Sequence, residues 1–225
     1  IAFLDSDDQW LPEHLEKGLF LLKEKKCHGI YGSFFIEKAD GIRREENVQA
    51  KPANISMAEY IFSSLGDTRT STFIFDSKCF KEVLFDENQD KHQDWDLAIR
   101  FDQKYELIAN TNKTVVIHQN VNNRMSSKMN HAATSYLLKK HAKYVSKKAL
   151  QTFYINLTLK TIYIEGKTEY FYRYAGYVKR LSNEHSIKLS KKNLIKMCLT
   201  KLPRPLFLLV YNAYLNFRIR KSMKE

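Results

Sequence analysis

The chain has 225 residues, of which 44% are hydrophobic and 28% charged, so it can form a buried core and is not a disordered protein. Its 7 Gly and 4 Pro exclude collagen-like and low-complexity sequences. The 3 cysteines are far apart and form no Cys-x-x-Cys pair, which favours a reducing compartment. No apolar run approaches the roughly 18 residues that a membrane-spanning helix needs.

The net charge of +12 is divided unevenly along the chain. Residues 1–138 contain 17 Lys and Arg against 21 Asp and Glu, a net charge of −4. Residues 139–225 contain 20 against 4, a net charge of +16. This distribution indicates a catalytic or binding body joined to a basic segment that contacts an anionic surface.

Hydrophobic periodicity predicts alternating strands and helices up to about residue 119, and helices alone after residue 130. The expected strands are residues 2–4, 30–36, 70–75, 107–109 and 114–118. The first expected helix is capped by Asp8 and carries apolar residues from Leu11 to Leu22, and the second is capped by Asn54 or Ser56 and ends at Leu65. The others are residues 77–83, 92–102, 134–164, 168–182 and 202–219. Residues 39–46 are expected to form a polar turn or hairpin loop around Gly41. This order predicts an α/β fold with a mixed sheet flanked by helices, over residues 1–124, followed by an all-helical, basic extension over residues 125–225.

Asp5-Ser6-Asp7-Asp8 follows an apolar strand pattern. Carboxylates two residues apart at the end of a strand can bind one hard divalent cation, with coordination positions left for phosphate oxygens. Ligands of open α/β sheets bind at such strand ends. The alternative is structural, with Asp5 and Asp7 forming a turn and Asp8 capping a helix.

Gln93-Asp94-Trp95-Asp96 is the second candidate cluster. A carboxylate near a helix start and beside a large aromatic ring becomes partly desolvated, and therefore a better proton acceptor. The alternative is a capping aspartate next to a core tryptophan.

Together these segments resemble a known family. Residues 3–12, 70–75, 85–87 and 94–100 are similar, in order and spacing, to the second half of a bacterial family 2 glycosyltransferase of the GT-A fold. The resemblance covers residues 1 to about 124. The chain begins at Ile1 inside a strand pattern and without Met, so we expect it to be N-terminally truncated and to lack the nucleotide-binding front of the domain.

The resemblance implies roles for individual residues. Asp5 and Asp7 would bind Mn²⁺ or Mg²⁺ as the DXD motif, and Asp94 would be the catalytic base. Gln93 departs from the family, which usually has Glu at this place. The remaining implied residues are Asp8, His118 and Arg124 for the donor diphosphate, and Ser71, Trp95 and Asp96 for the sugar pocket. His118 and Arg124 are equally well explained as strand-end and loop residues, and Ser71 as an ordinary strand residue.

The implied function is inverting transfer of a sugar from a nucleotide-diphospho-sugar to a hydroxyl of a cell-surface polysaccharide or lipid-linked acceptor. The apolar segment 202–217, followed by Arg218 and Arg220, predicts a helix that lies on the inner face of the bacterial plasma membrane, which places the protein in the cytoplasm as a peripheral membrane enzyme. The alternatives for this helix are packing onto the rest of the chain or onto a second copy in a homodimer. Two other functions stay open: a non-catalytic partner subunit, and a nucleic-acid-binding module through the basic segment. The segment has no RNP-like signature and its aromatic residues follow helical spacing, so nucleic acid is the less favoured partner.

Overall fold

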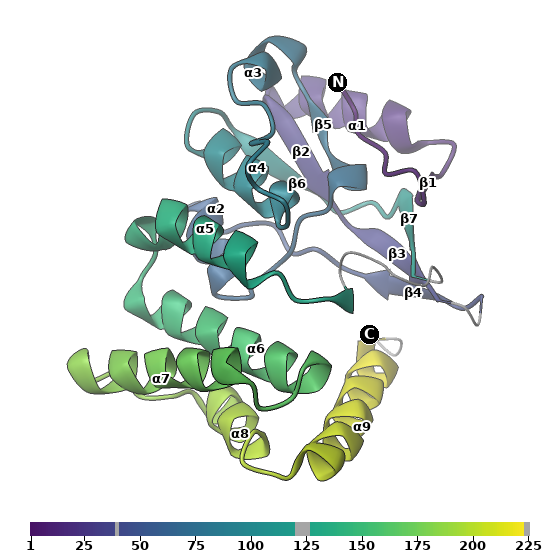
Figure 1. Cartoon of the computed structure of the whole chain (residues 1–225). Helices are drawn as coiled ribbons and strands as arrows, with labels where there is room; N and C mark the ends of the chain where they lie inside the picture. The colour runs from purple at the N-terminus through teal and green to yellow at the C-terminus, as the bar shows by residue number, and fades with distance from the viewer. Residues whose placement is uncertain (39–40, 120–126, 223–225) are drawn as a thin grey trace.

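The computed structural model describes residues 1–38, 41–119 and 127–222, with the side chains described up to residue 214. A part with two small sheets lies above a helical part in Figure 1. This arrangement confirms the predicted α/β fold followed by helices. The predicted boundary at residue 124 falls outside the described residues.

The strands form two mixed sheets. One is three-stranded, in the order β5-β2-β6, with β2 parallel to β6 and antiparallel to β5. The other is four-stranded, in the order β1-β7-β3-β4, with β3 parallel to β7. The strands are β1 (Gln9–Trp10), β2 (Gly29–Gly32), β3 (Phe34–Glu37), β4 (Arg43–Glu46), β5 (Ile74–Phe75), β6 (Leu107–Asn110) and β7 (Val115–His118).

The predicted strand at 30–36 is wrong as a single element, because the chain passes from one sheet to the other at Ser33. The Ser33 N–H still donates to the Asn110 carbonyl, at 2.9 Å. Its hydroxyl accepts from the Val48 N–H, also at 2.9 Å, which ties the crossing point to the loop after β4. Both β2 and β3 carry branched and aromatic residues, so the sequence pattern does not indicate the change of sheet at Ser33.

The predicted strand at 70–75 begins too early. Thr70–Thr72 form a short 3-10 helix, η1, and only Ile74–Phe75 are strand. The backbone N–H of Thr72 donates to the Arg69 carbonyl at 2.9 Å, and its hydroxyl donates to the same oxygen at 2.8 Å. A threonine side chain that bonds the local backbone in this way competes with strand pairing.

The helices of the sheet part are α1 (His14–Lys25), α2 (Met57–Phe62), α3 (Ser77–Lys81) and α4 (Gln93–Asp102). Ser56 caps α2 by accepting from the Glu59 N–H, as one of the two predictions had it. Asp8 does not cap α1, which begins after Glu13. The prediction failed because Asp8 is bound by Ser71 and His118, residues far away in the sequence.

The helical part comprises α5 (His131–His141), α6 (Lys147–Ile164), α7 (Glu169–Glu184), α8 (Lys191–Leu199) and α9 (Arg204–Ser222). Helix α6 is central to it. Phe153 of α6 stacks on Phe62 of α2, with ring centroids 4.4 Å apart, and contacts Trp95 of α4 edge-on. One hydrophobic core therefore includes buried residues of the sheets, of α5 and of α6.

Helix α9 folds back onto the helical part. Phe207 is fully buried in a second core cluster with Ile155 and Phe171, whereas Leu209 of the same helix is 69% exposed. This packing is one of the alternatives that the sequence left open for the segment. A search of the described helices for one with the length and hydrophobicity of a membrane span finds none.

Candidate active site

A cavity of about 1000 Å³ opens where the end of β7, the loop before β1, the loop before α4 and helix α6 meet. Asp5, Asp7 and Asp8 of the first predicted cluster and Asp94 of the second line it, as do His118 and Trp95. The structure therefore brings together acidic residues that are almost ninety positions apart in the sequence. The lining residues are Asp5, Ser6, Asp7, Asp8, Arg69, Thr70, Phe85, Asp86, Glu87, Gln89, Asp90, Lys91, His92, Gln93, Asp94, Trp95, Ile117, His118 and Lys160.

The first acidic cluster is a turn held in place by Ser71 and His118. The Asp8 N–H closes the turn by donating to the Asp5 carbonyl, at 3.0 Å. The Ser71 hydroxyl donates to Asp8 Oδ2 at 2.6 Å and accepts from the Asp5 N–H at 3.0 Å. The His118 N–H donates to Asp8 Oδ1 at 3.2 Å, and the His118 ring hydrogen-bonds the Asp7 carbonyl at 2.8 Å. Asp8 is therefore held in a structural position, while Asp5 and Asp7 remain exposed toward the cavity.

The predicted place of Ser71 in a sugar pocket is wrong. Its side chain is fully buried behind the acidic turn and does not line the cavity. Its hydroxyl is occupied by the two hydrogen bonds to Asp5 and Asp8. Ser71 is a positioning residue for the turn.

The charges of the turn favour a cation. Burial raises the pKa of Asp5, and the neighbouring carboxylates of Asp8 and Asp7 raise it further. Burial likewise raises the pKa of Asp8. A divalent cation would offset this repulsion, and carboxylate oxygens are the ligands that Mg²⁺ and Mn²⁺ prefer. No group of three or more His, Cys, Asp or Glu side chains in the described part of the chain is arranged to hold a metal ion. Asp5 and Asp7 are the two exposed carboxylates that the turn offers to such a cation.

Asp94 is the second residue of α4, and its Oδ1 accepts the Trp95 N–H at 2.9 Å. Burial raises the pKa of Asp94 to about 7, although Arg69 opposes the shift. The carboxylates of Asp67 and Asp5 add to the rise. A carboxyl with a pKa near neutrality, at the wall of a cavity, has the properties of a general base.

Sequence reasoning missed Asp67 and Arg69. Arg69 Nη2 lies 2.6 Å from Asp67 Oδ2, and the Trp95 indole N–H donates to Asp67 Oδ1 at 2.7 Å. Asp67 thus fixes Trp95 and Arg69, the two neighbours that set the environment of Asp94. Neither residue belongs to a recognisable motif, because their contact with Asp94 arises only in the fold.

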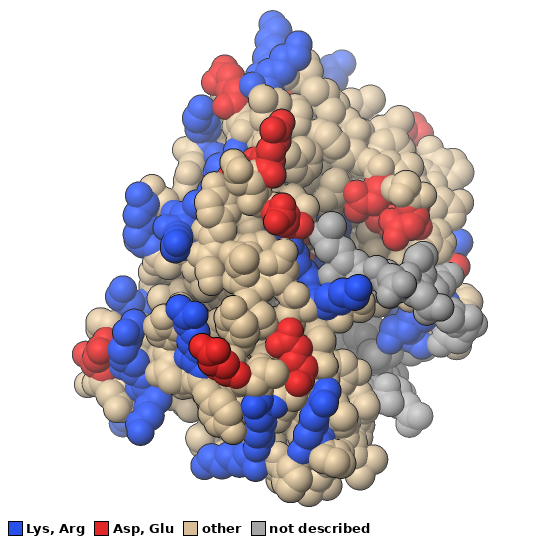
Figure 2. All heavy atoms as spheres, viewed as in Figure 1, with Lys and Arg blue, Asp and Glu red and all other residues tan. Residues whose placement is uncertain are grey.

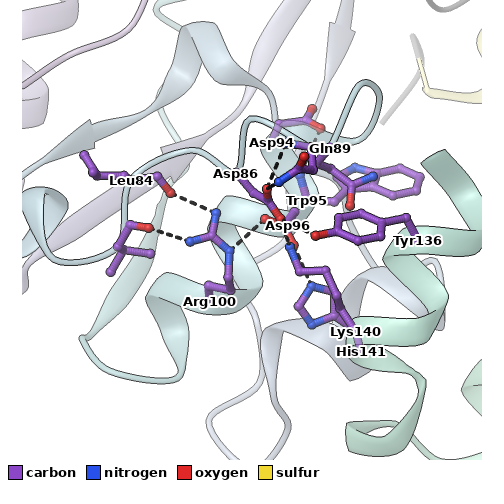
Figure 3. A network of polar contacts seen from close by, with 12 residues as sticks. Leu84, Asp86, Gln89, Asp94, Trp95, Asp96, Arg100, Tyr136, Lys140 and His141 are labelled. Carbon is purple, nitrogen blue, oxygen red and sulfur yellow. Dashed lines mark hydrogen bonds and ion pairs between the residues drawn. The ribbon is translucent and has the colours of Figure 1, made fainter.

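The predicted place of Asp96 in the sugar pocket is also wrong. A helix turns about 100° per residue, so residues two apart point to nearly opposite sides. Asp96 is fully buried and points toward Lys140 and His141 of α5 (Figure 3). Its carboxylate lies 2.5 Å from Lys140 Nζ, 2.8 Å from His141 Nε2 and 2.7 Å from Arg100 Nε. Burial opposes ionisation of Asp96, but the hydrogen bonds from His141, Lys140 and Arg100 and the charge of Arg100 lower its pKa overall.

One wall of the cavity is basic. Lys160 of α6 faces it together with Lys91 and Arg69. Burial lowers the pKa of Lys160 to about 8, and the charges of Lys91 and Arg69 lower it further. The sequence did not single out Lys160, because it lies in a segment whose aromatic residues indicated a helix core. The predicted diphosphate ligand Arg124 lies outside the described residues.

The fold and this cavity define an α/β protein with a site that combines acidic and basic side chains. Over 117 residues, or 48% of the chain, the sequence is 32% identical to the amylovoran biosynthesis glycosyltransferase AmsB of Erwinia amylovora. This similarity confirms the relation to glycosyltransferases that the motifs predicted. The chain is thus a relative of these enzymes, and the matched region spans 39% of the length of AmsB.

Solved protein structures also resemble this chain. The crystal structure of S. aureus TarS 1-349 in complex with UDP-GlcNAc matches with a TM-score of 0.43 and 14% identity. The match covers 87% of this chain and 53% of that chain. No protein-family model matches the sequence.

Proposed function

We propose that the protein takes part in inverting transfer of a sugar from a nucleotide-diphospho-sugar to a hydroxyl group. The observation that carries the proposal is that Asp94 shares one cavity with Asp5 and Asp7. The similarity to AmsB supports glycosyl transfer. The acidic turn supports a diphosphate-activated donor, because a cation held there would keep positions free for phosphate oxygens.

In the proposed reaction Asp94 accepts the proton of the acceptor hydroxyl. The hydroxyl oxygen attacks the anomeric carbon from the face opposite the diphosphate, the new glycosidic bond forms, and the nucleotide diphosphate leaves with the electron pair of the broken bond. With a pKa of about 7, a large fraction of Asp94 is ionised at neutral pH and still basic enough to take a proton. Arg69 keeps the pKa from rising further.

Asp5 and Asp7 would hold Mn²⁺ or Mg²⁺ at the mouth of the cavity. When bound, such a cation neutralises charge that develops on a leaving diphosphate. Asp8, Ser71 and His118 keep the turn in the conformation that presents the two carboxylates.

Asp94→Asn is the test of the catalytic role, assayed in the full-length protein. We expect turnover, measured as nucleotide diphosphate release across a panel of sugar nucleotides with Mn²⁺, to fall by about 10²- to 10⁴-fold while donor binding is kept. Asp90→Asn is the matched control, because Asp90 lines the same cavity but is exposed. Equal activity of the Asp94→Asn variant and the wild type would exclude Asp94 as the base. Release that is equally fast without the metal would remove the role of Asp5 and Asp7.

We further propose that the acceptor belongs to cell-surface polysaccharide synthesis and that the enzyme works in the cytoplasm, against the inner membrane face. The name of AmsB, an enzyme of amylovoran biosynthesis, supports the first part. The net charge of +16 over residues 139–225 supports the second, because an anionic leaflet attracts lysine and arginine. Phe153, Phe171 and Tyr174 are buried and therefore not available for base stacking, whereas Tyr144 and Tyr172 of the same part are exposed.

A further inference from the structure

A second cavity, of about 150 Å³, lies where the end of α2 meets α6 and α8. Every residue that lines it has an amide, hydroxyl or ammonium group, and none is acidic or apolar. The lining residues are Ser63, Ser64, Lys148, Gln151, Thr152, Lys188, Ser190, Lys192, Asn193 and Lys196.

Four lysines from three segments of the chain surround this small space. Lys148 is in the first turn of α6, Lys188 is in the connection after α7, and Lys192 and Lys196 are on α8. The side chains of Lys148, Lys188 and Lys192 are exposed, and their ammonium groups form no hydrogen bond or ion pair with any residue in the described ranges. Ammonium groups that line one small cavity repel one another, and an anion bound between them would offset this repulsion.

The polar walls of the cavity are held in place by hydrogen bonds between elements. Asn193 of α8 donates to the Thr152 hydroxyl of α6, at 3.2 Å. Asn156 of α6 donates to the Ser64 hydroxyl and accepts from Lys196 Nζ, both at 2.6 Å. These hydrogen bonds link the end of α2 to α6 and α8, and the bond to Asn156 fixes the direction of the Lys196 side chain.

We propose that this cavity binds a phosphate group. Ammonium and hydroxyl groups are suitable donors for the phosphate oxygens. The volume of about 150 Å³ is below the roughly 300 to 1,000 Å³ of cavities that enclose a whole small-molecule ligand, so the cavity accommodates an ionic group and not an entire sugar nucleotide. The site is separate from the acidic cavity and does not depend on the proposed transfer reaction.

The phosphate can belong to a lipid headgroup or to a soluble molecule. The outer side of α8 carries Leu194, 52% exposed, and Ile195, 60% exposed, beside the lysines of the cavity. Exposed aliphatic residues next to cations are typical of helices that lie in a membrane interface. Lys and Arg side chains also predominate on the helical part in Figure 2. These features favour a lipid phosphate.

The test compares two variants with the same loss of charge. The triple variant Lys148→Gln, Lys188→Gln, Lys192→Gln changes the cavity. The control Lys139→Gln, Lys179→Gln, Lys201→Gln removes three exposed lysines of the helical part that do not line it. Both are measured for co-sedimentation with phosphatidylglycerol–phosphatidylcholine vesicles, with pure phosphatidylcholine vesicles as the reference, and for binding of inorganic pyrophosphate by calorimetry. Circular dichroism checks that both variants are folded.

We expect the cavity variant to lose about 100-fold in affinity for the anionic vesicles, and the control to lose clearly less. Pyrophosphate binding that the cavity variant lacks, without any vesicle binding, would assign the phosphate to a soluble molecule. Equal losses in the two variants would show that only the diffuse charge matters and would overturn the proposal. Failure of the wild type to bind either probe would also overturn it.

Discussion

Replacing Asp94 by asparagine should change the stability of the protein in a way that depends on pH. The pKa of this carboxyl is about 7 in the folded protein, against 3.8 for an ordinary aspartate, so the folded state binds a proton that the unfolded state releases. Below about pH 4 the Asp94 carboxyl is protonated in both the folded and the unfolded protein, so its burial does not lower the stability through a buried charge. As the pH rises toward 7 the unfolded state ionises first, and the stability of the wild type decreases until the folded state ionises too.

The size of the expected stability difference follows from the shift in the pKa of Asp94. About three pKa units correspond to about 4 kcal/mol, and we expect about 2 to 4 kcal/mol because the carboxyl borders an open cavity. Asparagine has a similar shape and no charge. The Asp94→Asn variant should therefore gain stability relative to the wild type between pH 5 and pH 8.

Urea unfolding at pH 5, 6, 7 and 8 measures the difference directly and needs no substrate. Asp90→Asn provides the control, since Asp90 lines the same cavity and is exposed. A stability difference between the wild type and the Asp94→Asn variant that stays constant from pH 5 to pH 8 would refute the raised pKa, and with it the main electrostatic argument for a base at this position.

Three further pairs of variants test the packing. Asp96→Asn should lower the free energy of unfolding at pH 7 by about 3 kcal/mol, because it leaves Lys140 and Arg100 without their buried partner. Its control is Arg180→Gln, which removes an exposed ion pair and should change the free energy of unfolding by less than about 0.5 kcal/mol. Phe207→Ala should cost about 3 kcal/mol if α9 packs as described, and Leu209→Ala, at an exposed position, close to nothing. Gly66→Ala should be destabilising by about 1 to 3 kcal/mol, because the added methyl carbon would overlap the buried Tyr60 hydroxyl, while Gly176→Ala meets no atom within 4 Å and should stabilise α7 by about 0.5 to 1 kcal/mol. Chemical denaturation measures the free energy of unfolding of each variant. Equal changes in this free energy for the two variants of a pair would contradict the described packing.

The sequence predicted the parts of the site that depend on local pattern. Asp5, Asp7 and Asp94 were singled out from short motifs, and the fold places them at one cavity. Asp96 was assigned wrongly because it lies in the same motif as Asp94, although the helix turns it toward α5. The resemblance alone implies a sugar-pocket role for Ser71, and the structure places this residue in a 3-10 helix, buried behind the acidic turn.

Other features depend on contacts that no local pattern reports. Lys160 reaches the cavity because α6 packs on the sheet part, and Arg69 is held there by its ion pair with Asp67. Neither residue has a distinctive neighbour in the sequence. The same holds for the crossing at Ser33, since hydrophobic periodicity shows that a strand is present but not which sheet it joins.

The network around Asp96 has a practical consequence for anyone who divides this protein for expression. A shortened polypeptide ending near residue 124 would lack Lys140 and His141 and would keep Arg100 as the one remaining counter-ion of that carboxylate among those the structure describes. It would also uncover the rings of Phe62 and Trp95, which Phe153 covers in the intact chain. Such a product should aggregate or stay partly unfolded, so the two halves are best produced together.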